Sequence, residues 1–134
     1  MYKKIPFFVL IAIFLTSFHA TSMENMINIT SNKLSVDMNN RKSTFTGNVY
    51  AHNNNLKIWS DEMTINLKIN KDEIKEVLAI GNVKIIRLVE GSEIYGDVAN
   101  YLIEEEVIII KGDVTIKENG NQISGNELKV DLKN

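Results

Sequence analysis

One tripeptide occurs three times in this sequence, as Gly47-Asn48-Val49, Gly81-Asn82-Val83 and Gly112-Asp113-Val114. Its glycines lie 34 and then 31 residues apart (47 to 81 to 112). Internal repetition with a period of roughly 20 to 50 residues indicates stacked copies of one supersecondary unit rather than a single irregular core. The function of such a chain would depend on what the stacked units enclose and on how they join.

A second phrase lies between these tripeptides and occurs four times. It reads apolar, any residue, small residue, Asp or Asn, any residue, and then apolar at every second position. Its copies contain Ser31-Asn32, Ser60-Asp61, Gly96-Asp97 and Gly125-Asn126. A small residue followed by Asp or Asn tolerates tight backbone angles and bonds to nearby backbone groups, which favours a corner. The alternation after each corner predicts a strand with one buried face.

The apolar positions change parity at each corner. In the second copy they are even-numbered before the corner, at Leu56 and Ile58, and odd-numbered after it, at Met63, Ile65 and Leu67. A phase change of one residue moves side chains to the opposite face unless the strand bends or bulges. We therefore expect bent strands whose apolar face stays on one interior.

Most of the chain is predicted to be β-structure, because polar turns separate the alternating runs and no segment after the first residues has a helical period. Asn119-Gly120 is the strongest hairpin signal. The alternation also places Ile123, in the last run, on the buried face. The predicted fold is all-β and antiparallel, built from repeated bent hairpins and open at both ends. The expected strands cover residues 33–38, 42–51, 55–59, 62–69, 74–87, 92–95, 98–104, 106–118, 121–124 and 127–132.

The beginning of the chain has the features of a secretory signal peptide, which we assign to residues 1–22. A basic start is followed by an apolar run from Ile5 to Phe18, and small residues precede Met23. The run is short for a membrane span, although an uncleaved anchor is the alternative. Residues 23–134 would then form one domain.

Composition excludes several classes of function. Without Lys3 and Lys4, the 15 basic residues become 13 against 17 acidic ones, a net charge of −4. This net negative charge argues against a nucleic-acid-binding protein, because such proteins carry a basic patch or stripe. The chain has no cysteine, so a disulfide, a thiolate metal site and a thioether-linked lipid anchor are all excluded. No catalytic constellation is visible, and neither a metal nor a cofactor is expected.

The two phrases together resemble a known family. Phe45-Thr46-Gly47-Asn48-Val49, with Ile29 to Leu34 upstream and Ser60 to Met63 downstream, is similar to the OstA-like, or LptA, family of lipopolysaccharide-transport proteins. The resemblance covers about residues 27 to 132. It implies a folded-over β-jellyroll shaped as a trough, located in the periplasm of a Gram-negative bacterium, whose apolar interior holds the acyl chains of lipopolysaccharide.

The resemblance also implies partners. Troughs would associate head to tail through their edge strands, including self-association, and so bridge the inner and outer membranes. The other members of the bridge would be an anchored inner-membrane homologue and an outer-membrane insertion protein that carries the same domain. An edge strand with unpaired backbone groups is a physically reasonable joint.

The alternation proposes which side chains line such a trough, although each of them suits an ordinary packed core equally well. Two other hypotheses stay open: a structural β-solenoid or adhesin-like exported protein with a filled interior and no ligand, and a membrane-anchored member of the same transport system. Trp59 and Tyr95 repeat on the outward phase, either as a contact with another protein or as corner packing. The proposed lining residues are Phe45, Val49, Leu56, Ile58, Met63, Ile65, Val83, Ile85, Ile94, Tyr101, Val114 and Ile116.

Overall fold

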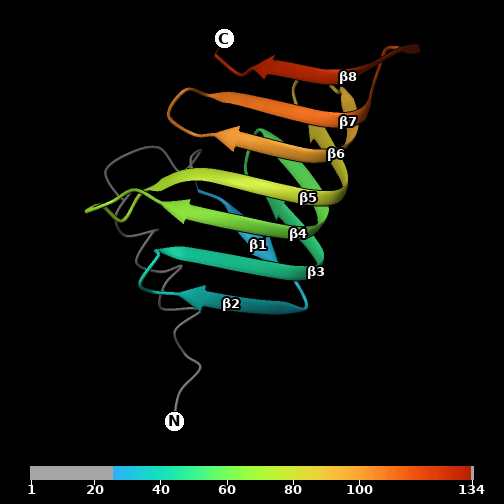
Figure 1. Cartoon of the computed structure of the whole chain (residues 1–134). Helices are drawn as coiled ribbons and strands as arrows, with labels where there is room; N and C mark the ends of the chain where they lie inside the picture. Colours follow the sequence, from blue (N-terminus) through green and yellow to red (C-terminus); the bar gives the residue numbers. More distant parts are fainter. Residues whose placement is uncertain (1–25, 134) are drawn as a thin grey trace.

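A single antiparallel sheet contains every strand of the part that the structure, a computed structural model, describes, which is residues 26–133. The expected signal peptide, residues 1–22, lies outside the described residues. The sheet order is β1-β3-β4-β5-β6-β7-β8 (Figure 1). β2 also pairs with β3, next to the segment of β3 that pairs with β1. The strands are β1 (Asn28–Thr30), β2 (Lys33–Asp37), β3 (Lys42–His52), β4 (Leu56–Leu67), β5 (Ile74–Arg87), β6 (Glu93–Leu102), β7 (Val107–Glu118) and β8 (Asn121–Asp131).

The all-β prediction is confirmed. Three of the four predicted corners lie inside strands rather than between them, whereas Ser31-Asn32 separates β1 from β2. The expected segments 55–59 and 62–69 form one strand, β4, and the later pairs likewise merge into β6 and β8. At each corner the pairing register shifts. Between the pairs Trp59–Lys84 and Glu62–Ile80, β4 contributes two residues and β5 contributes three. The extra residue forms a β-bulge, which bends the strand and keeps its apolar face on one interior. The three-residue strand β1 was not predicted.

The repeated glycines adopt a backbone conformation that other residues rarely take. Their φ angles are +87°, +88° and +90°, and each following Asn or Asp also has a positive φ. A Cβ atom built on Gly81 would lie 2.6 Å from Asp61 Oδ2 and 3.0 Å from Asp61 Cβ. Gly47 meets Asn32 and Gly112 meets Asp97 in the same way. Glycine is therefore required for two reasons: the backbone is left-handed there, and an Asp or Asn side chain occupies the space that a Cβ atom would need.

Two kinds of strand alternate across the sheet as a result. We call β3, β5 and β7 the glycine strands, because each carries one bulged Gly-Asn or Gly-Asp. We call β4, β6, β8 and the pair β1/β2 the corner strands, because each carries one corner phrase; in β1/β2 the corner interrupts the strand. The arrowheads of β2, β4, β6 and β8 all point the same way in Figure 1.

The interior lies on the concave side of the bent sheet. Met63, Ile85 and Ile110 are completely buried there. Ala79 of β5 pairs with Ala99 of β6, and this pair lies between Met63 of β4 and Ile110 of β7. Their burial removes apolar surface from water and is the main stabilising term of the fold.

One burial prediction is wrong. Ile123 pairs with Ile116 on the inner face but is 62% exposed. It lies in β8, which has a neighbour only on the β7 side among the described residues, and the part of β8 from Asn121 to Glu127 is exposed throughout. Alternation reports which face a side chain occupies, whereas burial needs a second layer over that face. Within residues 26–133, no helix is long and apolar enough to cross a membrane.

Candidate functional site

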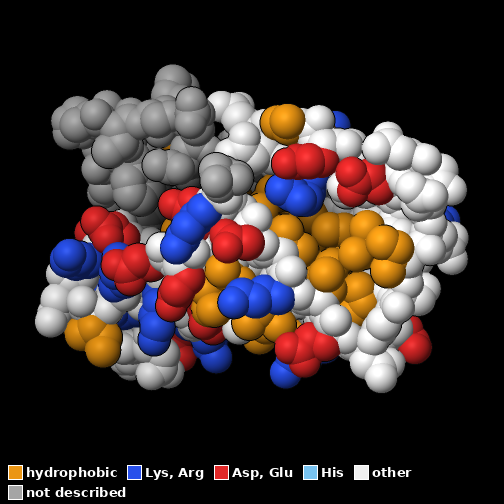
Figure 2. Space-filling view, turned by 90° about the horizontal axis from the view of Figure 1, so that it is seen from above, with side chains coloured by type: hydrophobic (Ala, Val, Ile, Leu, Met, Phe, Trp, Pro, Cys, Tyr) orange, Lys and Arg blue, Asp and Glu red, His pale blue; other side chains and the backbone are white. Residues whose placement is uncertain are grey.

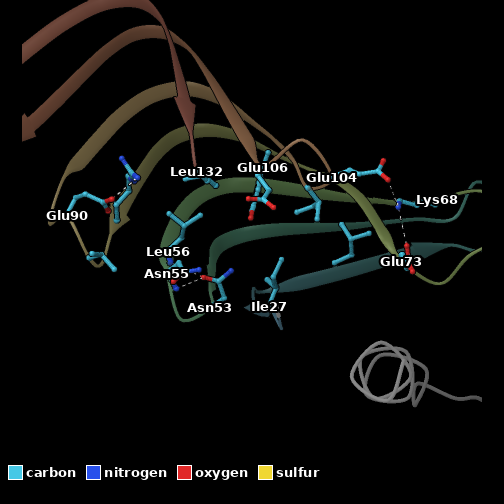
Figure 3. Close-up of a pocket in the computed structure, with 15 residues that line it drawn as sticks. Ile27, Asn53, Asn55, Leu56, Lys68, Glu73, Glu90, Glu104, Glu106 and Leu132 are labelled. Atoms are coloured by element: carbon cyan, nitrogen blue, oxygen red, sulfur yellow. Dashed lines mark hydrogen bonds and ion pairs between the residues drawn. The ribbon is translucent and has the colours of Figure 1, made fainter. Parts of the chain in front are cut away.

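A cavity of about 650 Å³ opens where the two ends of the bent strands approach one another. We call this opening the slit. One lip comes from the turns after β3 and β5, and the other comes from the turns after β4 and β6 together with Leu132 (Figure 3). The bulges make this arrangement possible, because they fold β4 and β5 over until both ends of each of these strands line one opening. The lining residues are Ile27, Asn53, Asn55, Leu56, Lys68, Glu73, Ile74, Arg87, Val89, Glu90, Tyr101, Ile103, Glu104, Glu106 and Leu132.

The floor of the slit is apolar and continuous with the core. Leu56 is buried within the core cluster, and Ile27, Ile74, Ile103 and Leu132 are partly buried against it. An apolar floor under an open mouth would let a hydrocarbon chain replace water without displacing a polar partner.

The rim of the slit is charged, with an excess of carboxylates. Lys68 Nζ donates to Glu73 Oε1 at 3.1 Å and to Glu104 Oε2 at 3.3 Å, and Arg87 Nη2 donates to Glu90 Oε2 at 2.9 Å. The hydrogen bond to Glu73, followed by the one to Glu104, raises the pKa of Lys68. Both lining cations are therefore already paired, and four glutamates face them. Such a rim does not favour direct binding of a phosphate group.

Tyr101 is the one ionisable side chain of the slit that the structure places among apolar residues of the core. Burial, and secondly the charge of Glu106, raises the pKa of its hydroxyl above the ordinary value of 10.0. Desolvation opposes formation of the phenolate, so the neutral form is the stable one at this position.

We expect the free energy of unfolding to fall as the pH rises above 10, and Tyr101→Phe to reduce that fall. A pKa that is higher in the folded state contributes stability below the unfolded value and loses it as the pH rises through the folded value. Lys68 and Tyr95, whose pKa values are also raised, contribute to the same alkaline loss. Urea unfolding at a series of pH values measures the effect. An equal alkaline loss in Tyr101→Phe and in the original chain would contradict the assignment.

The structure divides the proposed lining residues into two groups. Leu56 and Tyr101 border the slit, and Ile58 joins them around a small adjoining hollow. The others lie deeper in the packed interior, except Ile116, which is half-buried near the open β8 edge. Contact with lipid at any of these positions stays a prediction. The deeper group is Phe45, Val49, Met63, Ile65, Val83, Ile85, Ile94 and Val114.

Several slit residues were not predicted from the sequence. Ile74 and Ile103 flank polar turns, and the charged residues of the rim belong to those turns. Polar turns at the two ends of a straight strand are expected to lie apart on the solvated surface. The corner phrase could have predicted the slit, because a strand that folds at its middle brings the turns at its two ends together.

The C-terminal end of the sheet leaves a second apolar surface open. Seen from the β8 end, apolar side chains are visible between charged ones (Figure 2). Ile123 is exposed there, and Ile116, Leu128 and Leu132 are only partly buried. The interior is thus accessible at this end of the sheet. Within residues 26–133, no group of three or more His, Cys, Asp or Glu side chains could hold a metal ion.

The repeated aromatic residues form a row on the outer face. Tyr50 stacks on Trp59 with ring centroids 5.0 Å apart. Lys84 Nζ lies 5.3 Å from the Trp59 ring and 5.8 Å from the Tyr95 ring. Cross-strand aromatic and cation–π contacts stabilise neighbouring strands, so the repeated position has a structural role within the sheet.

Comparison with known proteins gives three findings. A family described as LptA/(LptD N-terminal domain) LPS transport protein matches residues 28–134. An uncharacterized protein of Rickettsia prowazekii (strain Madrid E), RP507, is 24% identical over 131 residues, covering 96% of this chain and 90% of that protein. The crystal structure of LptH, the LptA-homologous periplasmic component of the lipopolysaccharide transport device of Pseudomonas aeruginosa, superposes with a TM-score of 0.74. That match covers 83% of this chain and 79% of LptH at 14% identity, so it supports the fold alone.

Proposed function

This chain belongs to the LptA/(LptD N-terminal domain) family of LPS transport proteins, and from that premise we propose that it is a periplasmic carrier whose slit shelters the acyl chains of lipopolysaccharide. The observation that carries the proposal is the apolar floor of the slit, which is continuous with the core and opens to solvent. The family is one of transport proteins rather than enzymes, so the chain's task would be to bind and not to convert its lipid.

The energetic task of such a carrier is to offset the cost of exposing acyl chains to water. Each methylene removed from water is worth about 0.8 kcal/mol, so a lipid with several chains leaves its membrane only for a comparable apolar surface. Leu56, Tyr101 and Ile103 offer that surface at the slit. The deeper lining residues would contact a chain only if the two halves of the bent sheet move apart.

Recognition would rest on the acyl chains rather than on the headgroup. Lys68 and Arg87 are neutralised by carboxylates of the rim, and like charges repel an anionic headgroup. The headgroup would then stay outside the slit, in water. Passage of the lipid from one protein to the next would use the open edges of the sheet, where head-to-tail strand association continues the apolar interior between the membranes.

We expect Ile103→Lys to weaken acyl-lipid binding by at least about tenfold. Ile103 lies partly buried on one lip, so the ammonium can reach water while the apolar contact shrinks by about two methylenes, a loss of about 1.6 kcal/mol and slightly more than about tenfold in affinity. Displacement of a fluorescent fatty-acid probe by purified lipopolysaccharide measures the affinity. The matched control is Ile69→Lys, because Ile69 is 81% exposed and lies outside the slit.

The same assay tests the proposed function as a whole. Binding of the probe to the original chain, retained in Ile69→Lys and weakened at least about tenfold in Ile103→Lys, supports a carrier that uses the slit. Failure of the original chain to bind either the probe or lipopolysaccharide would overturn the proposal and favour an exported β-protein without a ligand. The membrane-anchored alternative depends on the amino terminus of the processed protein, which mass spectrometry determines.

A further inference from the structure

We propose that the free edge of β8 is a docking site for one antiparallel strand of a partner protein, and that this strand carries a bulged Gly-Asn or Gly-Asp. β8 is a corner strand, and its partner would be a glycine strand. The inference rests on the proposed function for the idea that sheets join at their edges. It goes further by naming the chemistry of the strand that fits.

The sheet contains three examples of the same joint. The Asn32 side chain lies against Gly47, Asp61 lies against Gly81 and Asp97 lies against Gly112. At the first joint the backbone N–H of Asn32 donates to the Gly47 carbonyl at 2.9 Å. At the second, Asn82 Nδ2 of the glycine strand donates to Asp61 Oδ2 at 2.8 Å. Each corner thus receives the glycine of the next strand, where a Cβ would collide with it.

The fourth corner has the same parts, and within residues 26–133 no glycine strand lies against it. Gly125-Asn126 lies at the register shift between β7 and β8, as the other corners do. Asn126 is exposed, and a Cβ built on Gly125 would approach only the Glu127 carbonyl, at 4.0 Å. β8 pairs with β7 alone among the described residues. The first joint uses asparagine and works in this chain, so Asn126 is chemically sufficient for a fourth.

The direction of the strands indicates that a second copy of this chain does not supply the missing strand, contrary to the self-association that the family resemblance implies. Because β1 and β2 share one place beside β3, the eight strands of residues 26–133 occupy seven positions. Seven antiparallel positions make both edge strands run the same way, and both edges are corner strands (Figure 1). A copy stacked in the same orientation would meet β8 with a parallel strand, placing Asn32 near Asn126 with no glycine between them. A partner whose free edge is a glycine strand fits instead.

The internal joints also predict the register of docking. At each of them the residue two before the corner Asp or Asn pairs with the residue three after the glycine, as in Trp59–Lys84 and Tyr95–Thr115. The residue after the corner pairs with the residue before the glycine, as in Glu62–Ile80. By this rule Ser124 would face the residue three after the incoming glycine.

A cysteine crosslink tests the joint, since the chain has no cysteine of its own to compete. The protein, purified as the cell processes it, carries Ser124→Cys. The probe is a synthetic peptide of residues 42–52, KSTFTGNVYAH, which is a glycine strand, with Tyr50→Cys at the third position after its glycine. Control peptides carry the cysteine at Val49, replace Gly47 by alanine, or use the corner-strand sequence of residues 28–38 with Thr30→Cys.

The expected result is a disulfide between the protein and the Tyr50→Cys peptide, reduced about tenfold by Gly47→Ala because a residue with a Cβ resists the left-handed backbone. The Val49 and corner-strand peptides should crosslink at background level. Equal crosslinking by the corner-strand peptide, by the Val49 peptide or by the Gly47→Ala peptide would overturn the proposal, as would no crosslinking at all. Probe binding at the slit in the same preparation separates the two ideas, because it tests the carrier function without involving β8.

Discussion

Replacing Ile85 by aspartate is expected to unfold the protein at 25 °C, with a loss of at least about 5 kcal/mol in the free energy of unfolding. Ile85 has no exposed surface and lies on the inner face of β5. Removing a buried isoleucine costs roughly 2 to 5 kcal/mol, and an unpaired carboxylate in an apolar interior adds several more. A domain of this size has a total stability of about 5 to 15 kcal/mol.

The matched control changes the next residue along the same strand. Ile86 lies on the opposite face and is only half-buried, so Ile86→Asp should cost about 1 kcal/mol, the span of strand propensities in a host protein. Urea unfolding followed by circular dichroism measures both variants, with Ile85→Val expected to lose about 1 kcal/mol. Similar losses in Ile85→Asp and Ile86→Asp would contradict the assignment of β5 to one buried and one outer face.

The second large effect concerns the repeated glycine. We expect Gly81→Ala to lower the free energy of unfolding by about 3 kcal/mol. Alanine in the left-handed region costs roughly 1 to 2 kcal/mol, and the new methyl group would overlap Asp61, whose Oδ2 lies 2.6 Å from the Cβ position. Overpacking of this kind costs a further 1 to 3 kcal/mol or so.

Gly91 separates the two contributions. Its φ is +74° and no atom lies within 4 Å of an added Cβ, so Gly91→Ala should show the backbone cost alone, about 1 to 2 kcal/mol. Adding Asp61→Gly to Gly81→Ala should recover part of the loss, since it removes the side chain that collides. Urea unfolding of the single and double variants completes the cycle. Equal losses in Gly81→Ala and Gly91→Ala, with no recovery in the double variant, would show that the contact with Asp61 has no energetic weight.

The fold was predictable because its signals are local. Alternation identifies the strands and their apolar face. The repeated Gly-Asn-Val or Gly-Asp-Val tripeptide, and the corner of a small residue followed by Asp or Asn, each indicate a backbone conformation that few other residues adopt. The prediction that the strands bend without turning their apolar face away from one interior followed from the parity change at Ile58 and Met63, and the bulge between β4 and β5 confirms it.

The slit was less predictable, because it is assembled from turns that belong to different hairpins. Leu56 and Tyr101 were identified as apolar inner-face residues, but nothing local distinguishes them from Ile85 or Val114, which are buried in the core. Lys68 and Glu104 are 36 residues apart along the chain, and neither has a pattern that indicates a partner.

The amino-acid sequence by itself determined most of the strand segments, their inner faces, the bulge positions and the family, since these depend on periodicity and on residues with narrow backbone preferences. Only the tertiary structure decided which inner-face side chains border an opening, how the rim charges pair, and that Ile123 is exposed although it lies on the inner face. The physical reason is that a side chain's face is a property of its own strand, whereas burial, charge pairing and open edges depend on how far the whole sheet bends and which strand comes last.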